Sequence, residues 1–272
     1  MQLTLCVKRD LHGCIFLNKL LPQLAGHEIS VLLSEKYRPA EGGIAALAEM
    51  AFLERNLPID TLFPLLDAAI AAGQKAGEWL TFNALQKKYG FSLSTVSDHP
   101  QLATALEKLH PELVISARFS HIFTPAMLAL VKHGIINIHP AALPSFAGLF
   151  GPMRTLAEGH DCFTCAVHLV DPGIDSGPLL HVARLPIKPG EGLLHQIAEI
   201  YPLAIPYLLH AIERLSRGEV LAPAAQDRSA RRYRSFPSPA EVAAFSAGGG
   251  RFWDAPPYQQ LLQKFQPEPP GL

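Results

Sequence analysis

The sequence predicts an α/β fold, with a Rossmann-like, doubly wound and mostly parallel sheet covered by helices. Three observations support this. Short apolar runs typical of buried strands alternate with amphipathic helical stretches along the chain. The first unit runs strand, helix, strand, the order that opens a doubly wound domain. The chain has 272 residues, of which 49% are hydrophobic and 17% charged, which is enough for one large core.

The N-terminal half is expected to hold three strands and four helices. The helix after the first strand has leucines on one face, and the last residue of the third helix is Gly90, a frequent end point. The turn after the first strand contains only Gly13, so a dinucleotide-binding G-x-G-x-x-G loop is not expected. The strands are predicted at residues 3–7, 27–34 and 112–117, and the helices at residues 13–24, within 35–58, at 79–90 and at 99–110.

The C-terminal half continues the same alternation. Thr124 is the expected N-cap of a helix that ends at Gly134. Pro202 and Pro206 interrupt a long apolar stretch and predict a helix pair or a kinked helix. Strands are predicted at residues 135–139, 162–170 and 178–187, and helices at residues 124–134, 153–160, 193–218 and 239–245.

Composition divides the chain near Gly218. Residues 1–218 are expected to form the main domain, and residues 219–272, rich in Pro, Arg and Gly, a small C-terminal extension that packs on it with its last residues frayed. The aromatic residues Phe252 and Trp253 either cap the core or close over a binding site.

Charge and cysteine content narrow the class of protein. The net charge is −1, so the chain lacks the excess of Lys and Arg with which proteins usually bind the phosphate backbone of a nucleic acid. No nucleic-acid partner is therefore expected. Cys162 and Cys165 form a single C-x-x-C on a predicted strand, only half of a structural zinc set, so no metal site is expected. The N-terminus lacks the layout of a signal peptide, and no apolar run reaches the length of a membrane span. The sequence therefore predicts a cytoplasmic protein without a membrane partner.

Three polar residues form the strongest candidate site. Asn137 and His139 are two residues apart on a predicted strand, so their side chains share a face. Asp175 lies in the turn VDPGIDSGP, where proline and glycine bend the backbone. Both segments are expected at the carboxyl edge of the sheet, where ligands bind in such folds. An amide and a protonated imidazole donate to a developing oxyanion, and a nearby carboxylate orients the imidazole.

Without a Ser or Cys nucleophile beside it, this trio suits attack by a substrate amine on a bound carbonyl. Ordinary turn and structural roles for the same residues are the alternative interpretation.

Two segments carry a family resemblance. NIHPAALPSFAG (residues 137–148) followed by VHLVDPGIDSGPLL (residues 167–180) resembles the folate-dependent formyltransferases, a family that includes the glycinamide ribonucleotide, methionyl-tRNA and sugar N-formyltransferases. The family pattern is N-x-H-P-x-x-L-P-x-x-x-G and then V-H-x-V-x-x-x-[LIV]-D-x-G-[PD], with a helix between. The resemblance covers residues 113–187. In the N-terminal half it is limited to the order in which strands and helices alternate. It implies the formyltransferase fold.

The resemblance implies an N-formyltransferase that takes the formyl group from 10-formyltetrahydrofolate. In this family's scheme Asn137 and His139 bind the formyl oxygen and its oxyanion. Asp175 orients and charges His139 and helps to move the proton of the attacking amine. Backbone groups of two loops hold the folate, and the candidates are Ser120, His121, Ile122, Phe123, Val170, Asp171, Gly173 and Ile174.

Departures from the family pattern narrow the acceptor. The turn after the first strand lacks the Gly-Ser-Asn loop of the glycinamide ribonucleotide enzymes, and the C-terminal segment is shorter than the barrel of the tRNA enzymes. Pro140 stands where related hydrolases carry a second histidine, and Ala147 where the sugar enzymes usually carry arginine. The acceptor predicted by elimination is an N-hydroxyornithine-type amine of siderophore synthesis, with an amino-sugar nucleotide as the alternative.

Arg118 and Phe150 are the candidate acceptor-binding residues. Arg118 either binds an acceptor carboxylate or pairs with a nearby acid. Two other functions stay open at this point. A 10-formyltetrahydrofolate hydrolase uses the same three residues with water in place of the amine, and a folate-binding protein keeps the pocket without the activity. The sequence makes no prediction of oligomeric state.

Overall fold

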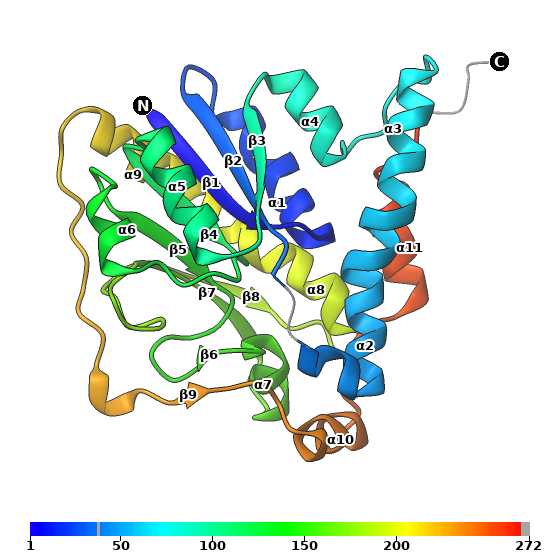
Figure 1. Cartoon of the computed structure of the whole chain (residues 1–272). Helices are drawn as coiled ribbons and strands as arrows, with labels where there is room; N and C mark the ends of the chain where they lie inside the picture. The colour runs from blue at the N-terminus through cyan, green and yellow to red at the C-terminus, as the bar shows by residue number, and fades with distance from the viewer. Residues whose placement is uncertain (37–38, 268–272) are drawn as a thin grey trace.

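The structure, a computed structural model, describes residues 1–36 and 39–267 and is organised around one seven-stranded sheet (Figure 1). The strands lie in the order β3-β2-β1-β4-β5-β7-β8. Strands β3, β2, β1, β4 and β5 run parallel to one another, whereas β7 is antiparallel to both of its neighbours. This mostly parallel sheet confirms the predicted fold class. The strands are β1 (Gln2–Lys8), β2 (Glu28–Ser34), β3 (Ser92–Val96), β4 (Leu113–Ala117), β5 (Ile135–His139), β7 (Cys162–Leu169) and β8 (Leu179–Pro186), with β6 (Ala147–Gly148) and β9 (Tyr233–Arg234) paired separately.

The helices begin and end at residues that satisfy their free backbone groups. Asp10, Thr81 and Asp98 each accept a hydrogen bond from a backbone N–H at the start of a helix. Gly90 ends α4 in the left-handed conformation, as the sequence predicts. The α-helices are α1 (Leu11–Leu20), α2 (Ala45–Ala51), α3 (Phe63–Ala71), α4 (Phe82–Tyr89), α5 (His99–Leu109), α6 (Pro125–Ala129), α7 (Gly151–Ala157), α8 (Leu193–Ile200), α9 (Ile205–Ser216), α10 (Pro239–Ala247) and α11 (Ala255–Gln263).

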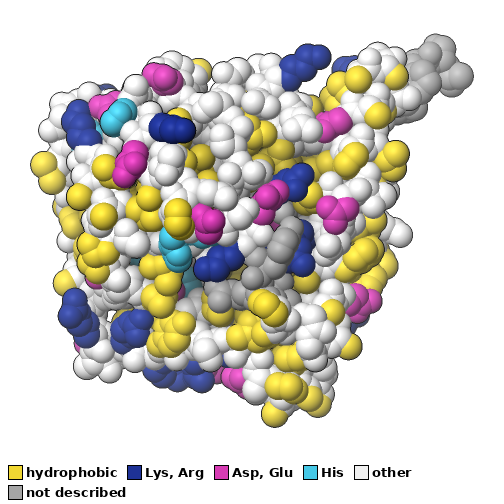
Figure 2. All heavy atoms as spheres, viewed as in Figure 1, with side chains coloured by type: hydrophobic (Ala, Val, Ile, Leu, Met, Phe, Trp, Pro, Cys, Tyr) yellow, Lys and Arg dark blue, Asp and Glu magenta, His cyan; other side chains and the backbone are white. Residues whose placement is uncertain are grey.

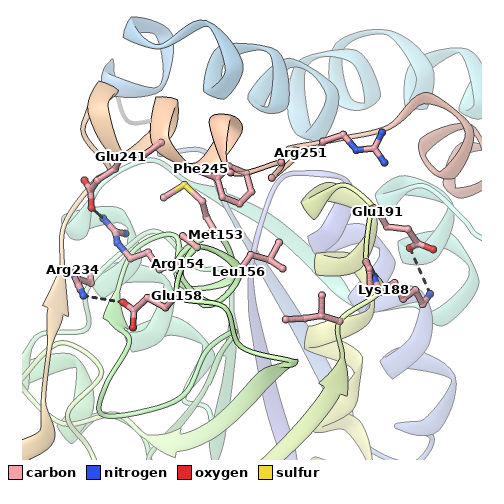
Figure 3. A pocket seen from close by; sticks show the side chains of 18 residues that line it. Met153, Arg154, Leu156, Glu158, Lys188, Glu191, Arg234, Glu241, Phe245 and Arg251 are labelled. Carbon is pink, nitrogen blue, oxygen red and sulfur yellow. Dashed lines mark hydrogen bonds and ion pairs between the residues drawn. The ribbon is translucent and has the colours of Figure 1, made fainter.

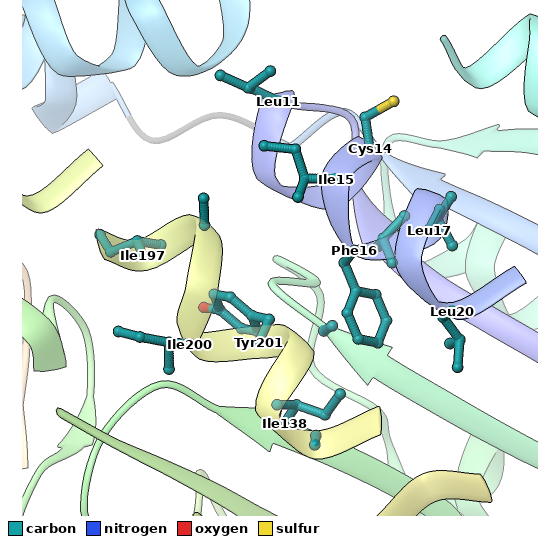
Figure 4. Packing of buried hydrophobic residues seen from close by; sticks show 14 of the residues in the cluster. Leu11, Cys14, Ile15, Phe16, Leu17, Leu20, Ile138, Ile197, Ile200 and Tyr201 are labelled. Atoms are coloured by element: carbon teal, nitrogen blue, oxygen red, sulfur yellow. The ribbon is translucent and has the colours of Figure 1, made fainter. Parts of the chain in front are cut away.

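The apolar core has two parts, one on each face of the sheet. Neighbouring residues of β1 point to opposite faces, so Leu5 joins the larger cluster and Cys6 the smaller. The larger cluster packs α1 against α8, and Figure 4 shows side chains of α1 near Tyr201 and Ile138. The smaller cluster lies beneath α5 and α6. Because both faces are covered, the central strands are almost wholly apolar.

The predicted helix ending near Pro58 is wrong in its length. Helix α2 continues through a π-helical segment (Phe52–Leu62) into α3 and ends only at Ala71. Figure 1 shows these segments as one long rod beside the sheet. Pro58 lies inside the π-helical segment, whose wider winding accommodates a residue that lacks a backbone N–H.

Other elements were missed or misjudged in length. Strand β3 was not predicted, because three of its five side chains are exposed at the sheet edge and no apolar pattern marks it. Helix α11 was also missed. The helix predicted at 124–134 begins at its Thr124 cap but ends at Ala129, since Val131 turns into the smaller core before Gly134 leads into β5.

The C-terminal extension packs on the larger core. Phe245 and Phe252 are buried in it with ring centroids 4.9 Å apart, the arrangement of a core cap. We retain the boundary at Gly218 as a proposal. The fraying predicted for the last residues concerns 268–272, which lie outside the described residues. Among the helices that the structure describes, none is long and apolar enough to cross a bilayer.

Candidate active site

The candidate site lies at the carboxyl edge of the sheet. Strand order reverses between β1 and β4, and in open α/β sheets ligands bind at such a reversal. A cavity of about 400 Å³ opens there. Figure 2 shows histidine, acidic and basic side chains gathered near the middle of this face. All the site residues predicted from the sequence line this cavity: Arg118, Ser120, His121, Ile122, Phe123, Asn137, His139, Phe150, Val170, Asp171, Gly173, Ile174 and Asp175.

His139 is held by a backbone carbonyl. Its ring is buried, and Nε2 donates a hydrogen bond to the Phe146 carbonyl oxygen over 2.8 Å. A carbonyl only accepts, so Nε2 carries a proton. The other ring nitrogen, Nδ1, faces Asp175 Oδ1 at 3.6 Å. Nδ1 is therefore the ring atom that faces the Asp175 carboxylate.

Asp175 is positioned by the turn that the sequence singled out. Its φ of 50° is left-handed, a conformation that aspartate tolerates better than most residues. Oδ2 accepts a hydrogen bond from the Gly148 N–H over 2.8 Å, while Oδ1 lies toward His139 and, at 3.8 Å, His168 Nε2. One oxygen is thus anchored by the backbone and the other faces two imidazoles.

His168 is a site residue that the sequence analysis did not assign. Its Nδ1 donates to the Leu169 carbonyl over 2.9 Å, so in the neutral ring Nε2 is an acceptor. Asn137 Nδ2 lies 3.1 Å from Nε2 and donates to it. Asn137 and His168 are direct partners across the antiparallel β5–β7 pair. His168 is the histidine of the V-H at the start of the second motif, so the sequence did contain a signal for it. Only the strand pairing shows that this histidine orients the Asn137 amide.

Burial lowers the pKa of His168 below its ordinary value of 6.5. The unfolded chain then binds more protons than the folded chain as the pH falls below about 6.5, so acidification lowers the free energy of unfolding. We expect His168→Gln to reduce this dependence in urea unfolding between about pH 7.5 and pH 5. His210→Gln, at an exposed position, is the control. Equal pH slopes for both variants contradict the assignment.

Gly148 connects the two motifs. It has φ of +100°, and a Cβ there would lie 2.1 Å from the Arg234 carbonyl oxygen. We expect Gly148→Ala to lower the free energy of unfolding by about 1–3 kcal/mol, because the new methyl group forces the backbone to shift, together with the N–H that anchors Asp175. Gly159→Ala is the matched control, with a φ of +75° but nothing within 4 Å of the new Cβ. Thermal unfolding measures both variants. Equal effects of the two substitutions contradict this role.

The loop after β4 forms one wall of the cavity. The Phe119 and Phe123 rings stack at 5.6 Å, and the buried His121 ring packs against Phe119. Burial lowers the pKa of His121. Ile122 on this loop and Ile174 on the opposite loop are 51% and 41% exposed. The two predicted folate loops therefore present exposed apolar side chains to one cavity.

Arg118 pairs with two carboxylates. Its Nη2 lies 2.7 Å from Asp10 Oδ2 and 3.2 Å from Glu54 Oε2. Of the two roles considered for it, pairing with a nearby acid is therefore present. Burial by itself raises the pKa of Glu54, but the Arg118 charge and a contact from His12 outweigh burial and hold that pKa well below its usual range. The cluster keeps fixed charges at the end of the cavity next to β1.

A second cavity of about 410 Å³ lies between α7, α10 and the end of β8 (Figure 3). Its centre is apolar, and its charged side chains form ion pairs with one another or, in the case of Arg251, with Asp254. Arg154 on α7 also donates to the Leu149 carbonyl, which supports the loop of the candidate site. The pairs are Arg154–Glu241 at 3.2 Å, Arg234–Glu158 at 3.0 Å and Lys188–Glu191 at 3.9 Å.

No cluster of His, Cys, Asp or Glu within residues 1–36 and 39–267 is arranged to hold a metal ion. Cys165 of the C-x-x-C is a buried free thiol, and burial raises its pKa to about 12, so it stays protonated.

Known proteins resemble this chain in sequence and in fold. Residues 73–199 match the family described as formyl transferase. The chain is 31% identical over 134 residues to a methionyl-tRNA formyltransferase of Synechococcus sp. (strain JA-3-3Ab), an alignment that covers 49% of this chain and 41% of the relative. It is 38% identical over 110 residues to a phosphoribosylglycinamide formyltransferase of Mycobacterium tuberculosis, covering 37% of this chain and 51% of the relative. The chain thus spans about half the length, or less, of these relatives.

Solved structures extend the likeness to the whole fold. An N-formyltransferase from Helicobacter canadensis has a TM-score of 0.55 at 14% identity and covers 86% of this chain and 71% of that chain. A phosphoribosylglycinamide formyltransferase from Anaplasma phagocytophilum has a TM-score of 0.52 at 16% identity, covering 86% of this chain and 98% of that chain. Residues 73–199 therefore match the formyl transferase family, and the chain shares the fold of these solved structures.

Proposed function

We propose that this chain transfers a formyl group from 10-formyltetrahydrofolate to the nitrogen of a small-molecule amine. The observation that carries the proposal is the convergence of Asn137, His139 and Asp175 on one cavity at the sheet edge. Two donors and one carboxylate at one place suit the addition of an amine to a carbonyl, where negative charge develops on oxygen and a proton must leave nitrogen.

The cavity walls suit the donor. A pterin ring is flat, with apolar faces and a polar edge. Exposed Ile122 and Ile174 offer apolar surface, and the backbone of the same two loops offers hydrogen bonds to the edge. The Helicobacter canadensis enzyme was crystallised with folinic acid, a formylated folate, which supports this choice of donor.

The donor supplies an electrophilic formyl carbon. A bond forms between this carbon and the acceptor nitrogen, the bond to the folate nitrogen breaks, and tetrahydrofolate leaves. In our scheme the second hydrogen of Asn137 Nδ2 and the Nδ1 proton of His139 stabilise the formyl oxygen as it gains charge. Asp175 takes the proton of the attacking amine and returns it through water to the folate nitrogen.

For the acceptor, we propose an N-hydroxyornithine-type amine, used in siderophore synthesis in the cytoplasm. An amino-sugar nucleotide is the second choice, since the Helicobacter canadensis enzyme was crystallised with dTDP-3-aminofucose.

The test is formyl transfer from 10-formyltetrahydrofolate, followed as tetrahydrofolate release, across a panel of amines with a no-amine control. The panel contains N-hydroxyornithine, amino-sugar nucleotides and glycinamide ribonucleotide. We expect release that depends on one class of amine. Release at the same rate without any amine makes the chain a hydrolase and contradicts transfer.

A further inference from the structure

We propose that the β1 end of the cavity binds the zwitterionic head group of an α-amino acid through Lys8, Glu54 and Arg118. The reacting nitrogen then lies at the far end of the amino acid side chain. This inference rests on the proposed formyl transfer and names the class of acceptor for the same site.

Strand register places the proposed head-group site beside the reaction site. Val7 pairs with Ala117, and Ala117 pairs with Ile138. The residues that follow these, Lys8, Arg118 and His139, therefore stand next to one another at the ends of three neighbouring strands. All three line the cavity.

Two cationic groups at this end are available to an anion. Among the described residues Lys8 has no ion-pair partner, although it lines the cavity. Arg118 uses Nε and Nη2 to hold Asp10 and Glu54, but no described carboxylate is bonded to its Nη1. Held by two acids and packed against the Tyr201 ring, the guanidinium cannot swing away, and its Nη1 group together with the Lys8 ammonium suits a carboxylate.

Glu54 provides the opposite charge. It projects from the helical rod, and its two oxygens lie 3.2 Å from Arg118 Nη2 and 3.1 Å from His12 Nδ1. Its side chain is 12% exposed and lines the cavity. In the proposal, the acceptor ammonium lies next to this carboxylate. Asp10 and Glu54 offset the positive charges of Lys8 and Arg118. Because carboxylates and cations lie together at this end of the cavity, it suits a zwitterion better than a phosphate dianion.

The helix N-terminus nearby is closed to a phosphate. Asp10 caps α1, with Oδ1 accepting from the Gly13 N–H over 2.8 Å. A carboxylate therefore already occupies the position at which a helix N-terminus would bind an anion. This argues that the acceptor of this chain does not present a phosphate to the turn after β1.

Spacing sets the length of the acceptor. Two strand spacings separate the backbones of Lys8 and His139, or about 10 Å. The Lys8 and His139 side chains take up part of this distance. A linker of about three or four methylene groups, spanning roughly 5–6 Å from Cα to the terminal nitrogen, fits the remainder. Diamino acids of ornithine or lysine length match this spacing.

The experiment measures binding first, so that it does not depend on turnover. The full chain with tetrahydrofolate is titrated calorimetrically with ornithine, with putrescine, which lacks the carboxylate, and with 5-aminopentanoate, which lacks the α-amino group. We expect ornithine to bind about 10- to 100-fold more tightly than either analogue, the usual effect of one charge-assisted contact.

Matched variants test which residue binds each charged group of ornithine. Lys8→Met, which breaks no ion pair among the described residues, is expected to remove the advantage of ornithine over putrescine. Glu54→Gln is expected to remove its advantage over 5-aminopentanoate. Lys132→Met and Glu49→Gln, at exposed positions outside the cavity lining, are the controls and keep both advantages. Tetrahydrofolate affinity verifies the fold of each variant.

The outcomes separate the two proposals. If the three ligands bind alike while an amino-sugar nucleotide or a phosphorylated amine is formylated, the head-group site is overturned and formyl transfer stands. If ornithine binds with the expected variant pattern but no panel amine releases tetrahydrofolate, the head-group site stands and formyl transfer fails.

Discussion

Asp175→Asn is expected to lower kcat for formyl transfer by about 10²- to 10⁴-fold, the range typical of a lost general acid or base. The amide oxygen of asparagine still accepts from the Gly148 N–H, so the turn keeps its shape. The group that faces His139 Nδ1 then carries no negative charge and takes no proton from the amine. Tetrahydrofolate release gives kcat, and binding of 5-formyltetrahydrofolate, expected to be largely kept, gives donor affinity.

The control for this substitution is Asp227→Asn, on an exposed turn whose carboxylate bonds locally to Ser229. It is expected to keep the turnover of the unmodified chain. Wild-type turnover in Asp175→Asn rules out the proposed proton route. A loss of turnover that is matched by a loss of folate binding assigns Asp175 to the fold of the loop instead of the reaction.

Asn137→Ala is expected to lower kcat/KM by about 10²- to 10³-fold, equivalent to about 2.7–4 kcal/mol of transition-state stabilisation for a lost oxyanion donor. The amide is aimed by His168 Nε2, which accepts one of its two hydrogens and leaves the other for the substrate oxygen. Steady-state kinetics over both substrates, with donor binding measured separately, test the expectation.

A double-mutant cycle with His139→Ala sharpens this test. If both side chains donate to the same oxygen, the effects of the two substitutions on kcat/KM are not additive. The second substitution then removes a hydrogen bond from an oxyanion that the first substitution has already left poorly stabilised. Additive effects contradict a shared oxyanion. His168→Gln belongs in the same series: glutamine offers a different acceptor to Asn137, and a smaller loss than in Asn137→Ala is expected for a residue that acts by orientation.

Local residue patterns predicted much of the fold. The apolar strands and most amphipathic helices followed from residue periodicity, and caps such as Thr124 and Gly90 marked their ends. The failures have physical causes. The polar edge strand β3 lacks an apolar alternation, and the rod through Pro58 depends on a π-helical winding that residue preferences do not indicate.

The sequence by itself determined that Asn137, His139 and Asp175 belong to one pair of motifs, and which two loops lie next to these motifs. This was possible because the proline and glycine residues of a turn, and the polar residues beside them, stand at fixed distances along the chain. It did not reveal His168 as the partner of Asn137, nor the cluster of Asp10, Glu54 and Arg118. Those relations depend on an antiparallel pairing and on the meeting of β1, β4 and the helical rod, segments far apart along the chain. Only the tertiary structure decides them, because hydrogen bonds and charge pairs between distant segments form where the packed sheet brings them together.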